Sequence, residues 1–389
     1  MIDYDKHKNN KVFCPVPWVH VALRSDGNVT PCCKWSNTDQ PIYEDYTYDP
    51  FGAFNSKNTL AFREQLEKGI KSIGCNQCYV NEEVGKESLR QRIIKIISSQ
   101  TPSAREQIFA SPQIRFLELN ISNFCNLKCA SCDIHQSNLW EKDEIELSKL
   151  GIIRPGPNIN TLKKFNTKDI NLDKLIENHL STDPSFTFFS IKILGGEPSI
   201  QPEVLTLLES CSKKDKLQFQ TNTNAVIFPY KLIQIFKKLN KVDISLSIDG
   251  IEDYDRYLRY PSNWKSKLEN IKKYMELASM YDNINIKFHC TVSILNIFHL
   301  EYYDSFLKKL FGENIVIFYS LLQRPEYLSI AYHKKVDIQA EEYVLNYMYS
   351  KQPNKQYINN FKIFKNYIEN SRDIKPLEEL DLRYAGMFD

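Results

Sequence analysis

Short runs of apolar and β-branched residues alternate with lysine-rich segments in the central part of the chain. The segments at 230–239 and 264–281 have helical character. Strands that alternate with helices form βαβ units, so the pattern predicts a parallel sheet. The six expected strands are fewer than the eight of a closed barrel, which allows an incomplete barrel or an open sheet. These strands lie at 114–120, 187–194, 217–222, 242–248, 284–292 and 315–320.

The first 90 residues follow a different pattern, rich in proline and glycine. Residues 19–23 predict a strand that enters a hairpin at 25–28, and residues 58–68 predict a short helix. Few apolar positions are available to fill a core here. A domain this small is expected to need a metal or a similar clamp.

The change of pattern along the chain predicts four segments. The tail is expected to hold helices near 340–349 and 357–368. The expected segments are a small cysteine-rich domain at 1–90, a helical linker at 91–111, a barrel domain at 112–325 and a helical C-terminal extension at 326–389.

Composition narrows the class of protein. The 389 residues are 42% apolar and 25% charged, which is typical of a globular chain with a core. A net charge of +2, from 50 basic and 48 acidic side chains, favours neither nucleic acid nor an anionic membrane as a partner. No stretch approaches the ~18 apolar residues of a membrane span, and the polar start does not resemble a secretory signal. We therefore expect a cytoplasmic protein.

Eight of the ten cysteines lie within the first 132 residues. In a reducing compartment, clustered cysteines indicate metal ligands or catalytic groups rather than disulfides. Cys125, Cys129 and Cys132 have C-x3-C-x2-C spacing just after an expected strand, so three thiolates could converge on one soft metal centre. Zinc is the alternative, with Asp133 or His135 as a fourth ligand.

Three ligands on a four-iron cube would leave one iron open to a small molecule. A second motif, Gly195-Gly196-Glu197-Pro198, ends the expected strand at 187–194. Its glycines would let backbone carbonyls approach an ammonium group, and Glu197 would supply negative charge. Both motifs follow strands of a βα series, where ligand sites gather.

In these two motifs the chain resembles the radical S-adenosylmethionine (SAM) superfamily. The resemblance implies an α/β fold with a partial (β/α)6 TIM-like barrel. It implies a catalytic [4Fe–4S] cluster on the cysteine triplet and binding of the SAM amino group at the Gly-Gly-Glu-Pro turn. It also implies that residues at the strand ends contact the SAM ribose and carboxylate. These residues are Asn222, Ser247, Asp249 and Arg259, and Arg256 is the alternative to Arg259.

A second set of cysteines comprises Cys14, Cys32, Cys75 and Cys78. Their spacing alone fits a zinc ribbon as well as an iron–sulfur site. The pattern also resembles the twitch (half-SPASM) domain of radical SAM enzymes, which implies an auxiliary [4Fe–4S] cluster. In those enzymes the domain usually follows the barrel, whereas here it precedes it. Cys33 is the alternative to Cys32, and the x4 spacing from Gly27 favours Cys32.

The resemblance implies an enzyme that cleaves SAM reductively and abstracts hydrogen from a substrate through a 5′-deoxyadenosyl radical. An auxiliary cluster favours oxidation, either dehydrogenation or peptide crosslinking. Epimerisation of a sugar or peptide is a second outcome, and a non-catalytic zinc-binding protein is a third. The expected partners are a small-molecule or peptide substrate and an electron donor such as flavodoxin or ferredoxin, without nucleic acid or a membrane.

Overall fold

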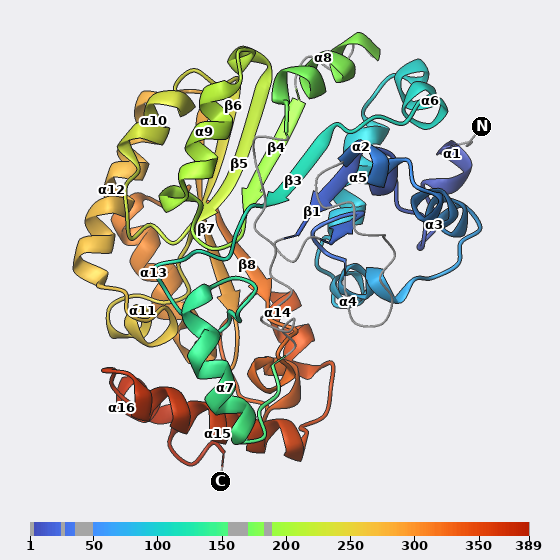
Figure 1. Cartoon of the computed structure of the whole chain (residues 1–389). Coiled ribbons are helices and arrows are strands. Elements are labelled where there is room, and N and C mark those ends of the chain that lie inside the picture. Colours follow the sequence, from blue (N-terminus) through green and yellow to red (C-terminus); the bar gives the residue numbers. More distant parts are fainter. Residues whose placement is uncertain (1–3, 25–27, 36–49, 155–169, 183–188, 389) are drawn as a thin grey trace.

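The chain is described from a computed structural model, which covers residues 4–24, 28–35, 50–154, 170–182 and 189–388. Its strands form one sheet in the order β2-β1-β3-β4-β5-β6-β7-β8 (Figure 1). Every neighbouring pair from β1 to β8 is parallel, and β2 is antiparallel to β1. The strands are β1 (His20–Leu23), β2 (Val29–Thr30), β3 (Phe116–Asn120), β4 (Phe189–Leu194), β5 (Leu217–Thr223), β6 (Lys241–Ser247), β7 (Ile284–Val292) and β8 (Ile317–Leu321).

Strands β3 to β8 stand at the six expected positions, and β2 and β8 are the two edges of the described sheet. The incomplete α/β barrel is therefore confirmed. Apolar side chains such as Leu117 and Ile191 face the main core, whereas Glu118 and Lys192 beside them face the other way. The paired positions Glu118, Lys192, Gln220 and Asp243 form a polar row across four strands.

Helices cover the outer face of the sheet, with α9, α10, α12 and α13 on one side of Figure 1. Helix α12 is capped by Asn263, which accepts from the N–H of Ser266 at 3.1 Å. The helices are α1 (Tyr4–His7), α2 (Pro50–Phe54), α3 (Lys57–Glu67), α4 (Asn76–Glu83), α5 (Leu89–Ser98), α6 (Pro102–Ala110), α7 (Glu141–Lys149), α8 (Leu172–Thr182), α9 (Pro202–Ser210), α10 (Tyr230–Phe236), α11 (Asp253–Leu258), α12 (Trp264–Met280), α13 (Leu300–Phe311), α14 (Glu342–Tyr349), α15 (Lys355–Ser371) and α16 (Leu377–Leu380). In the described ranges, none of these helices combines the length and apolar character needed to cross a bilayer.

The N-terminal segment contributes two strands to the sheet. Val21 of β1 pairs with Leu117 of β3, and Ala22 pairs with Thr30 of β2. The expected hairpin strands are thus present, and residues 25–27 of its turn lie outside the described residues. A separate apolar cluster around Phe13, Trp18, Trp35, Phe62 and Ile108 fills the rest of this segment. The sheet continues across the expected boundary at residue 90, which itself stays a prediction.

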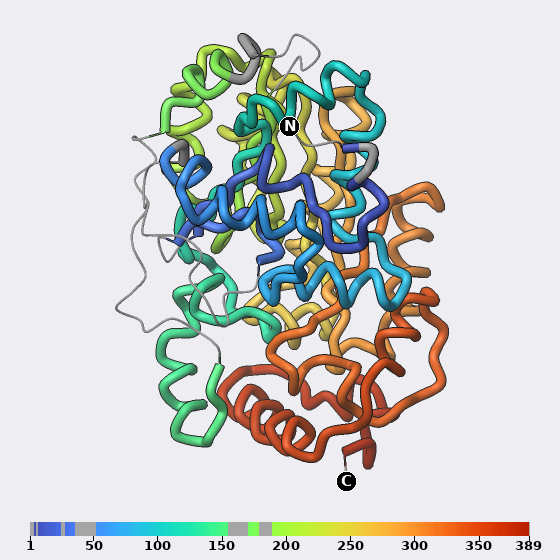
Figure 2. Tube along the Cα trace, turned by 90° about the vertical axis from the view of Figure 1, so that its right-hand side faces the viewer, coloured from blue at the N-terminus to red at the C-terminus, as the bar shows by residue number. Residues whose placement is uncertain are grey.

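The segment around α4 also contacts the edge of the sheet that β8 forms. The Lys86 ammonium donates to the carbonyl of Tyr319 on β8, and its Nζ lies 3.2 Å from the Tyr343 hydroxyl. The Asn346 amide of α14 donates to the carbonyl of Val84 at 3.4 Å. Figure 2 shows this light-blue segment next to the orange start of the C-terminal extension. It therefore links the two edges of the incomplete barrel.

The C-terminal extension is part of the main core. Its residues Phe361, Phe364, Ile368 and Leu377 are fully buried there. The Phe364 ring stacks on Trp140 with centroids 6.2 Å apart. Helix α15 consequently packs close to the loop that follows β3.

Candidate active site

The cysteine loop, residues 121–132, follows the C-terminal end of β3. The N–H groups of Lys128 and Ala130 donate to the carbonyls of Tyr260 and Leu258, both at 2.7 Å. The N–H of Cys125 donates to Asn138 Oδ1 at 3.0 Å. The loop is thus fixed on one side by the chain after α11 and on the other by the chain before α7.

The three thiols of this loop lie together and are buried or half-buried. Burial, followed by the charge of Cys129, raises the pKa of Cys125 to about 12. A hydrogen bond with Cys132 and the nearby Arg259 guanidinium lower the pKa of Cys129 to about 7. Grouped thiols beside a guanidinium fit a thiolate-bound metal centre. In the part of the chain that the structure describes, no three His, Cys, Asp or Glu side chains are arranged around a single metal ion, whereas a cube binds each thiolate on a different iron.

The Gly-Gly-Glu-Pro turn lies directly on the cysteine loop. The N–H of Glu197 donates to the Phe124 carbonyl at 2.9 Å. The Gln201 amide reaches the same carbonyl at 3.3 Å and the Gly195 carbonyl at 2.8 Å. The two motifs, 63 residues apart between Cys132 and Gly195 in the sequence, are therefore one structural unit.

Both glycines of the turn are required by this contact. Gly195 and Gly196 have φ values of +86° and +52°, which favour glycine. A Cβ on Gly196 would lie 2.1 Å from the Phe124 carbonyl oxygen, and one on Gly195 would lie 2.8 Å from that of Ser122. The glycines therefore let the turn approach the cysteine loop, in addition to any approach to a ligand.

The Glu197 carboxylate fixes the turn to the C-terminal end of β5 through hydrogen bonds. It accepts from the Thr223 hydroxyl at 2.7 Å, the Asn224 N–H at 2.7 Å and the Ser199 N–H at 3.0 Å. Pro198 begins the short 3-10 helix η6 (Pro198–Ile200) and is buried. Because protein donors already hold this carboxylate, its contact with a SAM amino group stays a prediction.

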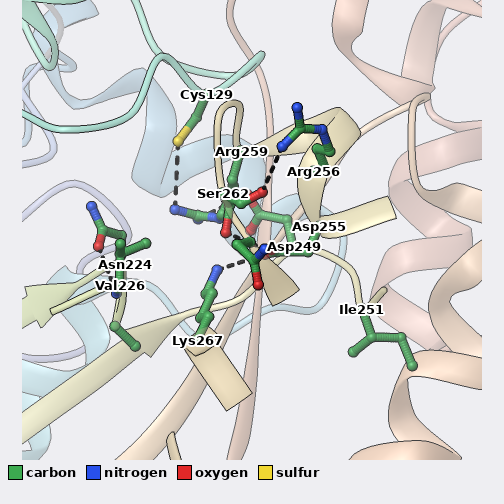
Figure 3. Close-up of polar contacts among 12 residues, drawn as sticks. Cys129, Asn224, Val226, Asp249, Ile251, Asp255, Arg256, Arg259, Ser262 and Lys267 are labelled. Atoms are coloured by element: carbon green, nitrogen blue, oxygen red, sulfur yellow. Dashed lines mark hydrogen bonds and ion pairs between the residues drawn. The ribbon is translucent and has the colours of Figure 1, made fainter. Parts of the chain in front are cut away.

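Arg259 connects two of the expected site residues. Its Nη2 lies 2.8 Å from Asp249 Oδ2, and its Nη1 lies 3.8 Å from Cys129 Sγ (Figure 3). Although burial opposes it, the charges of Asp249 and Cys129 raise the pKa of Arg259. Arg256 instead bonds Asp373 in the C-terminal extension, with Nη2 and Oδ2 3.0 Å apart. The geometry thus places Arg259, and not Arg256, beside the cysteine loop.

Asn222 and Ser247 lie near the C-terminal ends of β5 and β6. Asn222 is opposite Ser245, and Ser247 is opposite His289 of β7. The carboxyl ends of parallel strands meet at one edge of the sheet, where the cysteine loop and the turn also lie. Their roles toward SAM stay predictions.

The N-terminal cysteines also lie near one another. Burial, and then the charges of Cys75 and Cys78, raise the pKa of Cys14. Cys32 is half-buried, and the charges of Cys78, Cys14 and Cys75 also act on its pKa. For Cys33, the group whose charge acts most on the thiol is instead the Glu118 carboxylate of β3. This difference favours Cys32 over Cys33 as the fourth member of the set, which stays a prediction, and Gly27 lies outside the described residues.

Several residues of the site were not expected from the sequence. Gln201 joins the turn to the loop, and Asn138 holds the N–H of Cys125. Arg154 Nη2 donates to the carbonyls of Ala130, at 3.3 Å, and Cys132. Gln201 follows the turn directly and could have been suspected from that position. No pattern in the sequence around Arg154 identifies it, because its contact with the cysteine loop depends on how the chain after α7 folds.

Comparison with known proteins agrees with this geometry. Residues 119–286 match the Radical SAM superfamily, a range that includes the cysteine loop, the Gly-Gly-Glu-Pro turn and the Asp249–Arg259 pair. The residues of the site therefore lie within a range that matches this superfamily, which uses SAM with a [4Fe–4S] cluster.

Two curated relatives resemble the chain. An uncharacterized protein of Methanocaldococcus jannaschii is 26% identical over 211 residues, covering 53% of this chain and 62% of that protein. The radical SAM cyclopropyl synthase TigE of Paramaledivibacter caminithermalis is 24% identical over 250 residues, covering 62% and 45%. The chain thus spans less than two thirds of the length of either relative.

Solved structures are more distant. Streptococcus suis SuiB bound to the precursor peptide SuiA has a TM-score of 0.40 and 15% identity, covering 83% of this chain and 67% of that chain. Native anSMEcpe with bound AdoMet has a TM-score of 0.36 and 17% identity, covering 66% and 60%.

Proposed function

We propose that the chain is a radical SAM enzyme in which Cys125, Cys129 and Cys132 hold the catalytic cluster. The observation that carries the proposal is the hydrogen bond of 2.9 Å from the Glu197 N–H to the Phe124 carbonyl, which joins turn and loop. When bound, the cluster supplies one electron to SAM, which breaks into methionine and a 5′-deoxyadenosyl radical. The protein holds SAM against the turn and keeps water away.

Asp249 and Arg259 lie at the edge of this site, where they would contact SAM. Arg259 is 7% exposed, and its Nε has no hydrogen-bond partner among the described residues. A buried donor without a partner is costly, so a ligand acceptor is expected there. The Asp249–Arg259 pair is therefore assigned to the SAM carboxylate and ribose side, with Asn222 and Ser247 on the neighbouring strand ends.

The substrate is proposed to bind against the polar face of the sheet. Glu118 and Lys192 form an ion pair of 3.6 Å, with Gln220 and Asp243 next along the paired row. A row of polar groups on one face of a sheet is suited to recognising a substrate. A small molecule or a peptide segment with hydrogen-bonding groups fits this lining.

The set Cys14, Cys32, Cys75 and Cys78 is proposed to hold an auxiliary [4Fe–4S] cluster. Four thiolates satisfy such a cluster completely, so its contribution would be electron transfer. The leading outcome is then oxidation of the substrate, as a dehydrogenation or a peptide crosslink. A reduced flavodoxin or ferredoxin is the proposed electron donor.

A second candidate, epimerisation, is favoured by Cys33. After burial, the Glu118 carboxylate of the polar row is the group that acts most on the pKa of the Cys33 thiol. Such a thiol could give its hydrogen atom to a substrate carbon radical, breaking S–H and forming C–H. One electron from the same reduced donor protein and one proton from solvent would restore the thiol.

Anaerobic purification tests the proposal. We expect about eight irons per chain, four for each cluster, and formation of 5′-deoxyadenosine from SAM under reduction. The Cys125→Ala/Cys129→Ala/Cys132→Ala variant should keep about four irons and form none. Colourless wild-type protein that contains zinc and no iron would overturn the proposal and establish the zinc-binding alternative.

A further inference from the structure

Arg372 follows α15 in the C-terminal extension and is 6% exposed. None of its three guanidinium nitrogens has a hydrogen-bond partner among the described residues. The guanidinium lies over two aromatic rings instead, with its Cζ 4.9 Å from the Trp140 centroid and 5.5 Å from that of Tyr260. A buried cation with no anionic partner is strongly unfavourable.

The residues that the structure describes do not supply the missing anion. Asp143 is the carboxylate that acts most on Arg372. Both of its oxygens already accept from the Lys128 ammonium at 2.8 Å, and Oδ1 also accepts from the Tyr367 hydroxyl at 3.2 Å. Arg154 is a second cation nearby, 4.2 Å from the Trp140 centroid. The local balance of charge is therefore positive.

The rings beneath Arg372 belong to the support of the cysteine loop. Trp140 Nε1 donates to the Cys129 carbonyl at 3.1 Å, and the Tyr260 carbonyl accepts from the Lys128 N–H at 2.7 Å. Cys129 is also among the groups whose charge acts on Arg372. The guanidinium thus lies behind the loop, on the side of the C-terminal extension, and after Asp143 the Cys129 thiol is the group with negative charge that acts on it most.

We propose that the cluster on Cys125, Cys129 and Cys132 is the counterion of Arg372, and that the C-terminal extension tunes the cluster through this residue. The inference rests on the proposed function. A cluster gains negative charge when it is reduced, so a buried cation nearby stabilises the reduced state and raises the reduction potential. Arg372 does not touch the reacting atoms and is a tuning residue.

A redox titration followed by electron paramagnetic resonance tests the effect on the cluster. The cluster with an open iron is recognised as the signal that changes when SAM is added. In Arg372→Gln we expect this signal to titrate at a lower potential, with a change on the order of tenfold in the ratio of reduced to oxidised cluster, or ~59 mV for one electron. Arg372→Lys should restore most of the wild-type value.

The matched control is Lys375→Gln, which removes the same charge three residues away. Lys375 is 59% exposed and pairs with Asp253 on α11, so solvent screens it. Its potential should equal that of the wild type. Equal potentials in Arg372→Gln and the wild type would overturn the inference. A wild type with no SAM-responsive cluster would instead overturn the proposed function.

Thermal unfolding gives an independent readout that does not need the redox signal. Without the cluster, Arg372→Met should unfold at the same or a higher temperature than the wild type, because it removes an uncompensated buried charge. Binding of the cluster should raise the unfolding temperature of this variant by less than it raises that of the wild type. If Arg372→Met lowered the unfolding temperature equally in cluster-free and cluster-bound protein, the role of Arg372 would be merely structural and the inference would be overturned.

Discussion

Arg259 lies between Asp249 and Cys129, 2.8 Å from the carboxylate of the first and 3.8 Å from the sulfur of the second. A single buried guanidinium thereby links the end of β6 to the cysteine loop. The neighbouring Asp255–Lys267 pair, fully buried with an O···N distance of 2.5 Å, holds α11 against α12, and the Arg259 N–H donates to the Asp255 carbonyl at 2.8 Å. The position of the loop thus depends on ion pairs within the barrel.

Replacing Arg259 should be far more costly than replacing Arg256. Arg259→Gln leaves Asp249 buried and unpaired, so we expect a loss of about 3–5 kcal/mol in the free energy of unfolding. Arg256→Gln breaks a pair with Asp373, which is 94% exposed, and should cost below about 1 kcal/mol. Urea unfolding of the two variants measures this. Similar losses would contradict the placement of Arg259 in the buried site.

Gly196 should not tolerate a side chain. Gly196→Ala places a Cβ 2.1 Å from the Phe124 carbonyl oxygen, so the turn must leave the cysteine loop. We expect destabilisation by at least about 2 kcal/mol and loss of SAM cleavage. Gly312→Ala is the control, because its φ is +98° with open space around it, and it should cost only about 1–2 kcal/mol of backbone strain. Normal SAM cleavage by Gly196→Ala would refute the contact.

The two adjacent N-terminal cysteines should behave differently. Cys32→Ala removes one thiol of the set Cys14, Cys32, Cys75 and Cys78, so the iron content should fall from about eight to about four per chain. Cys33→Ala should keep all the iron, since Glu118, and not one of the other cysteines, is the group whose charge acts most on the Cys33 thiol. Iron and sulfide assays on anaerobic protein decide this. Loss of iron in Cys33→Ala alone would reverse the assignment.

Acid should destabilise the chain partly through His333. Burial lowers the pKa of this fully buried imidazole to about 4. Its Nε2 lies 2.8 Å from the Tyr327 carbonyl, and its Nδ1 has no partner among the described residues. In the unfolded chain the His333 imidazole has a pKa of about 6.5, so the unfolded state takes up the proton first. The stability that the neutral imidazole contributes is therefore present above pH 6.5 and is lost as the pH falls toward 4.

Between pH 6.5 and pH 5 the loss from His333 should be about 2 kcal/mol. Urea unfolding at both pH values measures it, and the His333→Gln variant should lose correspondingly less. His135 provides a control, since it is partly exposed and lies beside Asp133. If His333→Gln and the wild type had equal slopes against pH, a neutral buried imidazole would be ruled out.

The sequence by itself determined the strands and the two motifs of the site. Strands β3 to β8 were predictable because apolar periodicity and turn residues act locally. The C-x3-C-x2-C loop and the Gly-Gly-Glu-Pro turn were also visible, because each is formed by consecutive residues. The polar groups at the ends of β5 and β6 were assigned through the resemblance to the family.

Only the tertiary structure decided which distant groups meet. It placed β1 beside β3, separated Cys32 from Cys33, chose Arg259 over Arg256 and brought Arg372 behind the cysteine loop. Trp140 and Arg372 are 232 positions apart in the sequence, and no local pattern specifies the contact between them. It arises because α15 must bury Phe361 and Phe364 in the main core, and that packing carries the arginine to the loop.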